Sequence, residues 1–98
     1  MTSIREIKQA ACVVGGVTMM DLMSHRRARR VAAPRMAACI VAYETTPATL
    51  MEIGRAFDRD HTTVMHALRQ RQRRDLVEAA QQIRARLCRV MTAADIGL

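Results

Sequence analysis

Leu50 to Leu68, LMEIGRAFDRDHTTVMHAL, is the stretch that decides the fold, because it describes two short helices joined by a tight turn. Apolar residues recur at helical spacing in its first half and again in its second half. Thr49 and Glu52 form a capping-box pattern at the start of the first helix, and Asp60 is a typical N-cap for the second. The sequence therefore predicts a helix-turn-helix over residues 49–73.

The second helix of this motif carries a polar outer face. If Val64, Ala67 and Leu68 point inward, a rotation of about 100° per residue turns the polar side chains outward. The residues on that face or beside it are His61, Thr62, Thr63, Met65, His66, Arg69 and Arg73. Short polar side chains followed by arginines suit a helix that lies in the major groove of DNA.

The composition indicates one small all-α domain with a polyanionic partner. Ninety-eight residues leave no room for a second domain, so residues 1–98 are predicted to form a single one. Half of the residues are hydrophobic, but only Tyr43 and Phe57 are aromatic, which favours helices packed through small and flexible side chains. The net charge is +7, and all basic residues except Lys8 are arginines, the side chain best suited to phosphate and guanine.

The cysteines do not indicate a disulfide framework or a metal site. Cys12, Cys39 and Cys88 are far apart, odd in number and never in a CxxC pair. We predict buried thiols in a reducing cytoplasm. No apolar run reaches the roughly 18 residues of a membrane helix. No catalytic constellation stands out either, so we expect a cytoplasmic, non-enzymatic protein without cofactors or metals.

The rest of the chain reads as further helices around an arginine-rich loop. A first helix begins after its cap Ser3 and ends at Gly15-Gly16, and a second covers residues 18–23 with Thr18 as its cap. Residues 24–35 contain five arginines and no acid, which is typical either of a solvated loop or of nucleic-acid binding. Pro34 is expected to begin a third helix that ends near residue 44.

Asp75 is a candidate cap for a final helix over residues 76–94. Its apolar positions recur at steps of three and four, and they are Leu76, Ala80, Ile83, Leu87, Val90 and Ala94. We favour docking of this seam on the domain's own core over a coiled-coil dimer, because two to three heptads are short for the latter.

Two blocks of the sequence resemble the DNA-binding domain of the bacterial replication initiator DnaA. The first runs from Glu52 to Ala67 and contains RDHTTVMHA, a far more specific string than generic helix-turn-helix patterning. The second, Asp21 to Arg35, is similar to the family's basic loop. The resemblance covers residues 3–72 and implies a Trp-repressor-like domain of about six helices that binds double-stranded DNA.

The resemblance also implies individual contacts. In the family the Asp-His-Thr-Thr turn supplies base and phosphate contacts, which implies base reading by Asp60, His61 and Thr62, with Thr63 on a phosphate. For Asp60 a role as cap alone is the alternative, and His66 could instead pack on the neighbouring helix. An arginine of the basic loop enters the minor groove, and the matching position is Arg27. The predicted DNA-binding set is Arg26, Arg27, Arg29, Arg35, Thr46, Met51, Asp60, His61, Thr62, Thr63, His66 and Arg69.

Arg35 matches a phosphate contact at the start of the third helix, where the helix terminus also attracts anions. Arg26, Arg29 and Arg30 could substitute for Arg27. Some positions depart from the family, since Met51 replaces a proline that touches a base, and only Asp58 stands where one or two glycines are usual. Asp tolerates a left-handed backbone better than most residues, so the turn can survive.

The resemblance implies binding to a DnaA-box-like site, linked to replication initiation or its regulation. The chain has no Walker A motif, so we expect no ATPase activity, and we interpret it as an excised domain or a free-standing, nucleoid-associated reader. The full-length initiator is a possible partner, and a monomer on DNA is favoured over a dimer. The alternative is a protein-interaction or transcription-regulator module that binds the initiator or dimerises through its last helix.

Overall fold

The computed structural model describes the backbone of residues 3–24 and 29–96, and the side chains of residues 3–24 and 30–88. This part of the chain folds into six helices and no strand, which confirms the all-α class. The helices are α1 (Ile4–Gly15), α2 (Met19–Met23), α3 (Arg29–Thr45), α4 (Leu50–Ala56), α5 (His61–Arg69) and α6 (Arg74–Ile96).

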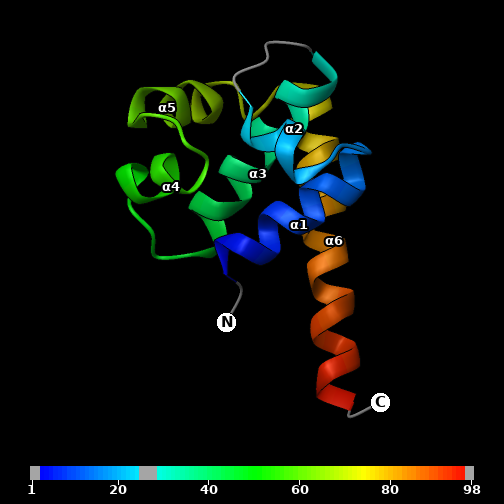
Figure 1. Ribbon diagram of the computed structural model, residues 1–98. Coiled ribbons are helices and arrows are strands. Elements are labelled where there is room, and N and C mark those ends of the chain that lie inside the picture. Colours follow the sequence, from blue (N-terminus) through cyan, green and yellow to red (C-terminus); the bar gives the residue numbers. More distant parts are fainter. Residues whose placement is uncertain (1–2, 25–28, 97–98) are drawn as a thin grey trace.

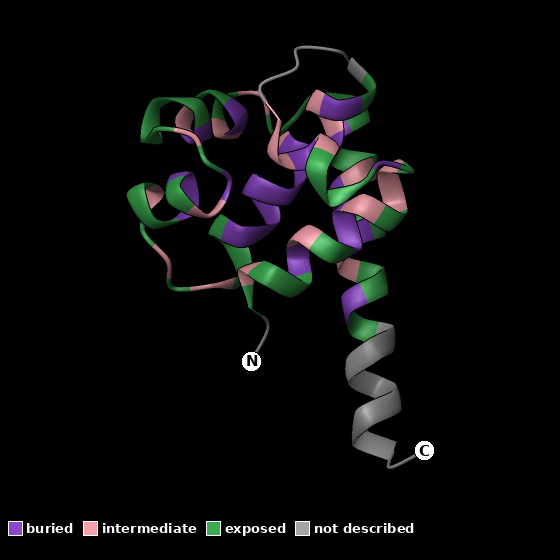
Figure 2. Cartoon of the chain, viewed as in Figure 1, coloured by how far each residue is buried: buried purple, intermediate pink, exposed green. Residues whose placement is uncertain are grey.

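Helix α3 lies at the centre of the molecule (Figure 1). It packs against α1 and α6 on one side and against α5 and α4 on the other. Its middle, residues 37–42, is buried on every face, as the purple ribbon in Figure 2 shows. The helix-turn-helix is therefore mounted on a central helix that the rest of the chain encloses.

The first two helices begin where their capping residues predict. The Ser3 hydroxyl accepts a hydrogen bond of 3.2 Å from the backbone N–H of Glu6. Thr18 and Asp21 form a capping box in which each side chain accepts from the other's backbone N–H. Helix α1 ends at Gly16, whose φ of 64° is left-handed, so these local sequence signals are confirmed.

Helix α3 begins earlier than the sequence predicts. Pro34 was expected to be its first residue, but the helix starts at Arg29 and Pro34 lies inside it. The proline ring packs against Gly15, where an added Cβ would lie only 2.4 Å from the ring's Cγ. Burial of the ring offsets the lost backbone donor, so part of the predicted loop, residues 29–35, is helical.

Phe57 anchors the helix-turn-helix to the rest of the core. Its side chain is fully buried together with Ile7 of α1, Leu22 of α2 and Ile53 of α4. The ammonium of Lys8 lies 5.8 Å from the centre of the Phe57 ring. Its Nζ also donates a 2.8 Å hydrogen bond to the carbonyl of Ala56, the last residue of α4. Lys8 thus joins α1 to the carboxyl end of α4.

The apolar seam of α6 docks on the domain itself. Leu76, Ala80, Ile83 and Leu87 are buried, and α6 packs on α3 and α1. This confirms the preferred interpretation for these four positions. The remaining two seam positions, Val90 and Ala94, lie outside the described side chains.

The connection between α5 and α6 is longer than expected, because α5 is shorter. Helix α5 ends at Arg69 instead of continuing to Arg73, because tight turns follow, with Arg73 N–H donating to the Gln70 carbonyl at 2.9 Å. Helix α6 then begins at Arg74, so Asp75 lies in its first turn and does not precede it. The Asp75 carboxylate is bound by Arg73, which accounts for its failure to act as the predicted cap.

The cysteines fit the prediction only in part. None of the three forms a disulfide. Cys39 is buried, and burial raises the pKa of its thiol to about 12. Cys12 is half-buried and Cys88 is exposed, so the expectation that all three are buried is wrong.

Within the described residues, no helix has both the length and the apolar character needed to span a membrane.

Candidate nucleic-acid interface

Helices α4 and α5 form the predicted helix-turn-helix. Thr49 and Glu52 complete a capping box at the start of α4, with hydrogen bonds of 3.2 and 3.1 Å. The turn contains Asp58, whose φ of 55° is left-handed, as the sequence predicts for the position where glycine is usual in similar sequences. A very close approach then brings the turn back to α4: the Arg59 N–H donates to the Gly54 carbonyl at 2.7 Å.

Gly54 is required by this approach. A Cβ at this position would lie 2.6 Å from the carbonyl oxygen of Arg59 and 3.2 Å from that of Asp60. Because both neighbours are backbone atoms, a side chain here would push α5 away from α4. The absence of a side chain at Gly54 therefore sets the crossing of the two helices.

The amino end of α5 is an exposed and organised polar site. Asp60 is the N-cap, and its Oδ1 accepts from the Thr63 N–H at 3.1 Å, from the Thr63 hydroxyl at 3.3 Å and from the Thr62 hydroxyl. The Thr62 hydroxyl, followed by the Thr63 N–H, lowers the pKa of Asp60 below its usual value. His61, Thr62 and Thr63 are exposed, while Val64 and Ala67 are buried as predicted.

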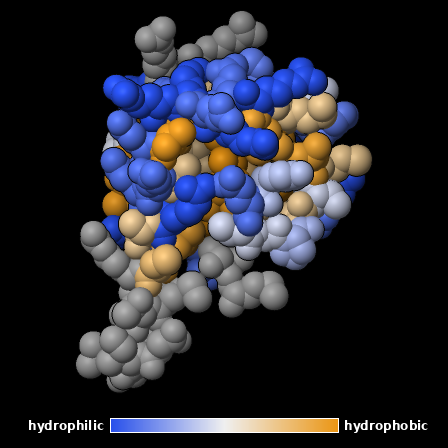
Figure 3. All heavy atoms as spheres, turned by 180° about the vertical axis from the view of Figure 1, so that it is seen from behind, coloured by the Kyte–Doolittle hydropathy of each residue, from blue (hydrophilic) through white to orange (hydrophobic). Residues whose placement is uncertain are grey.

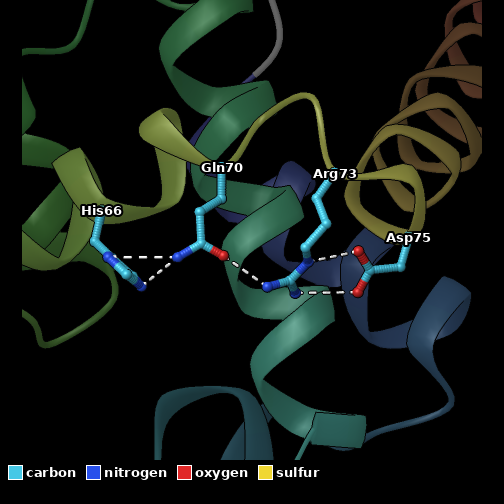
Figure 4. Close-up of polar contacts among 4 residues, drawn as sticks. All are labelled: His66, Gln70, Arg73 and Asp75. Atoms are coloured by element: carbon cyan, nitrogen blue, oxygen red, sulfur yellow. Dashed lines mark hydrogen bonds and ion pairs between the residues drawn. The ribbon is translucent and has the colours of Figure 1, made fainter.

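A chain of polar contacts leads from the outer face of α5 to α6 (Figure 4). Asp75 binds Arg73 through both of its oxygens, at 2.7 and 3.0 Å, and Arg73 donates to the Gln70 Oε1 at 2.6 Å. Gln70 Nε2 lies 2.6 Å from His66 Nε2. Since the Gln70 oxygen already accepts from Arg73, its amide nitrogen is the donor and the His66 nitrogen is the acceptor.

His66 is thus exposed as predicted, and the chain of contacts holds its ring. Arg73, which the sequence also predicts to face outward, belongs to the same series of contacts, and its charge is paired with Asp75. Arg69 and Met51 are also exposed, and 59 % of Met51 is accessible to solvent. Thr46 is half-buried and its hydroxyl donates to the Ala42 carbonyl at 2.6 Å, so it closes the end of α3.

The surface near the motif is strongly basic. Figure 3, which views the molecule from behind, shows hydrophilic side chains over much of the upper half of that face, with apolar residues between them. The described side chains include six exposed arginines in α3, α4, α5, the segment that follows α5 and the first residue of α6: Arg30, Arg55, Arg69, Arg71, Arg73 and Arg74. A surface of this kind attracts a polyanion.

The structure contradicts the prediction that Arg35 contacts phosphate. Arg35 is only 7 % exposed, and it lies well inside α3 because this helix begins at Arg29. Its Nε donates to the Leu22 carbonyl at 2.8 Å, and its Nη2 donates to the carbonyls of Ser24 at 2.7 Å and Asp21 at 3.4 Å. These carbonyls form the carboxyl end of α2, which attracts a cation. Arg35 is therefore a structural anchor.

Three other residues of the predicted set cannot be placed with their side chains. Arg26 and Arg27 lie outside the described residues, and Arg29 contributes only its backbone to the description. Their expected role at the minor groove stays a prediction. Their neighbour Arg30 is described and exposed.

Sequence reasoning missed Arg59. Its Nη2 donates to the Ser24 carbonyl, the same acceptor that Arg35 uses. Burial, and next the nearby charge of Arg59, lower the pKa of Arg35. The position of Arg59 inside the RDHTTV string was a signal that it mattered, but its partner 35 residues away could not be read from spacing.

Known protein sequences match the part of the chain that contains α4 and α5. The family described as "Bacterial dnaA protein helix-turn-helix" matches residues 4–70. Among curated proteins, the "Chromosomal replication initiator protein DnaA" of Bartonella quintana (strain Toulouse) is 49 % identical over 67 residues, which are 67 % of this chain and 14 % of that protein. The protein of the same name from Sphingopyxis alaskensis is 47 % identical over 68 residues, 68 % of this chain and 15 % of that protein.

The initiator protein of Caulobacter sp. (strain K31) is 46 % identical over 68 residues, 68 % of this chain and 14 % of the relative. The chain thus spans only about one seventh of the length of the curated relatives it matches. The family match includes α1 to α5 and ends at Gln70, before α6 begins.

Proposed function

The chain belongs to the bacterial DnaA helix-turn-helix family, and from this membership we propose that it binds a specific double-stranded DNA site resembling a DnaA box. The observation that carries the proposal is the amino end of α5, where an ionised cap and three exposed polar residues stand together. Residues 1–98 act as one DNA-binding domain in this proposal. A helix-turn-helix domain is normally non-enzymatic, so the expected activity is binding.

The major groove is read by the start of α5. Hydrogen bonds from Thr62 and Thr63 meet on Oδ1 of Asp60. This leaves Oδ2 to accept from the exocyclic amine of cytosine or adenine, which answers how one carboxylate can both cap a helix and read a base. His61 and Thr62 complete the reading through hydrogen bonds or a thymine methyl contact, and Thr63 contacts a phosphate.

The minor groove is read by the arginine-rich loop that the sequence predicts at residues 24–35. An A·T-rich minor groove is narrow and strongly negative, which favours an inserted guanidinium. Arg27 matches the family position for this contact, and Arg26, Arg29 and Arg30 are its neighbours. Outlying contacts come from Thr46, Met51, His66 and Arg69. Since Met51 replaces the usual family proline, the preferred site resembles the initiator's box without being identical to it.

The biological role in this proposal is replication initiation or its regulation at the nucleoid, with the full-length initiator as a second partner. A reader that occupies initiator boxes can block or tune initiation. Dimerisation through the last helix has less support, because Leu76, Ala80, Ile83 and Leu87 of the seam are buried in the domain's own core. A monomer on DNA is the expected state.

The decisive experiment is selection of bound duplexes from a random pool, followed by titration of the selected site. We expect one asymmetric consensus and binding at least ~10³ tighter than to scrambled duplex, the low end for specific readers. His61→Ala should reduce that ratio, whereas Arg86→Ala, at an exposed arginine of α6, should leave it unchanged. A pool without a consensus, or a ratio insensitive to His61, would overturn the proposal.

A further inference from the structure

One backbone carbonyl joins the two halves of the candidate interface. Ser24 is the C-cap of α2, and its carbonyl oxygen accepts from Nη2 of Arg35 and from Nη2 of Arg59. The first guanidinium comes from α3 and the second from the turn between α4 and α5. These three residues are called the Ser24 clamp below.

We propose that the Ser24 clamp fixes the reading end of α5 relative to α2 and α3, and that Arg59 is a positioning residue for base reading by α5. The inference rests on the proposed function, because it concerns how that reading end is held. Arg59 directly precedes Asp60, so its side-chain bond to Ser24 restrains the residue next to the N-cap of α5.

The carboxyl end of α2 makes it electrostatically possible for two arginines to meet at one carbonyl. A carbonyl oxygen has two lone pairs and can accept from two donors, but bringing two guanidinium groups together is unfavourable. The carboxyl end of α2 offsets this repulsion, because Arg35 also donates to Leu22 at 2.8 Å and to Asp21 at 3.4 Å. Hydrogen bonds from charged donors are also stronger than neutral ones.

The two arginines reach the clamp in different ways. Arg35 uses Nε and Nη2 to reach Leu22 and Ser24 together, which a single ammonium group cannot do. Arg59 reaches across 35 residues of sequence from a turn already fixed by its own N–H bond to Gly54 at 2.7 Å. The turn is thus held to α4 through its backbone and to α2 through its side chain.

The two possible roles of Arg59, positioning residue or phosphate contact, predict different effects of its removal on DNA binding. An arginine that binds phosphate strengthens binding to every duplex, and its removal lowers the salt slope by about one. A positioning arginine leaves the number of phosphate contacts unchanged. Its loss therefore weakens the selected site while scrambled duplex binds as before.

The test is Arg59→Ala measured on the selected duplex and on scrambled duplex over a range of salt concentrations. We expect binding to the selected site to weaken by about tenfold, within the range for losing one base contact, with scrambled duplex and salt slope unchanged. Arg55→Ala, at an exposed arginine in α4 of the same motif, is the matched control and should leave the ratio intact. Equal loss on both duplexes with a reduced slope would overturn the clamp, as would an unchanged ratio.

Hydrogen exchange in the absence of DNA separates this inference from the proposed function. Arg59→Ala should speed exchange of the amides at the end of α2 and in the first turns of α3, residues 22–24 and 30–33, while α6 is unchanged. If wild type shows no site preference but this exchange increases, the proposed function fails and the clamp stands. If exchange and specificity both resemble wild type, the clamp fails and the proposed function stands.

Discussion

Residues at the amino ends of α5 and α3 were both expected to contact DNA, but Asp60 and Arg35 lie in different environments in the structure. At α5, Asp60 is bound by Thr62 and Thr63, within three residues of itself, and all three stay exposed. At α3, Arg35 is buried and binds carbonyls 11 to 14 residues earlier in the chain. Local hydrogen bonds thus leave Asp60 available to a ligand, whereas the long-range hydrogen bonds of Arg35, which was expected at a helix start, go with its burial.

The strongest test of this comparison is Arg35→Ala. The substitution leaves the Leu22 and Asp21 carbonyls without their charged donor and the Ser24 carbonyl with Arg59 alone, and we expect the free energy of unfolding to fall by about 3 kcal/mol. Chemical denaturation measures it. Arg30→Ala, at an exposed position of the same helix, should change stability by less than about 0.5 kcal/mol. Equal effects of the two substitutions would show that burial of Arg35 does not matter.

Gly54→Ala tests the crossing that supports α5. The new Cβ would meet the Arg59 carbonyl oxygen at 2.6 Å, and overpacking against backbone should destabilise the fold by about 2 kcal/mol. Gly16→Ala is the control, because its φ of 64° disfavours alanine while nothing lies within 4 Å of the added carbon. That change should cost about 1 kcal/mol, through backbone strain alone. Thermal unfolding of both variants gives the order, and a reversed order would contradict the close approach.

Two substitutions at Asp60 separate its role as helix cap from its proposed role in base recognition. Asp60→Ala removes the cap and should reduce stability by about 1 kcal/mol, whereas Asp60→Asn retains capping and should cost a few tenths. Both should lower the preference for the selected duplex, because neither leaves a carboxylate to accept from a base amine. If Asp60→Asn keeps full preference, Asp60 is a cap alone.

Acid should weaken the α5 start in a defined direction. The Thr62 hydroxyl and Thr63 N–H lower the pKa of Asp60 in the folded chain, so ionised Asp60 stabilises the fold above its unfolded-state pKa. This small contribution is lost as pH falls through the lower folded-state pKa. Carboxyl shifts in an NMR titration should place that pKa below the usual value for aspartate. The stability advantage of wild type over Asp60→Asn should shrink over the same pH window.

Local features of the fold could be predicted from the sequence, because their causes lie a few residues apart. The caps at Ser3, Thr18, Thr49 and Asp60 all form as predicted, and Asp58 adopts the left-handed turn. The buried seam of α6 followed from its spacing in the same way.

Long-range features could not be predicted in this way. Pro34 lies inside α3 because its ring meets Gly15, and Arg59 binds Ser24 across 35 residues. Neither partner can be identified from local spacing. For the same reason an arginine's charge alone did not distinguish Arg35, which is buried, from Arg30, which is exposed.

Lys8 has a practical consequence for work in cells. It is the single lysine of the sequence, and its ammonium is held by the Ala56 carbonyl at 2.8 Å beside the Phe57 ring. The other basic side chains are guanidinium groups and imidazoles, so reagents that target lysine side chains have a single site in this chain. A photoreactive side chain in place of the exposed Met51 is therefore a better way to crosslink the chain to the proposed DNA site than a lysine-directed reagent.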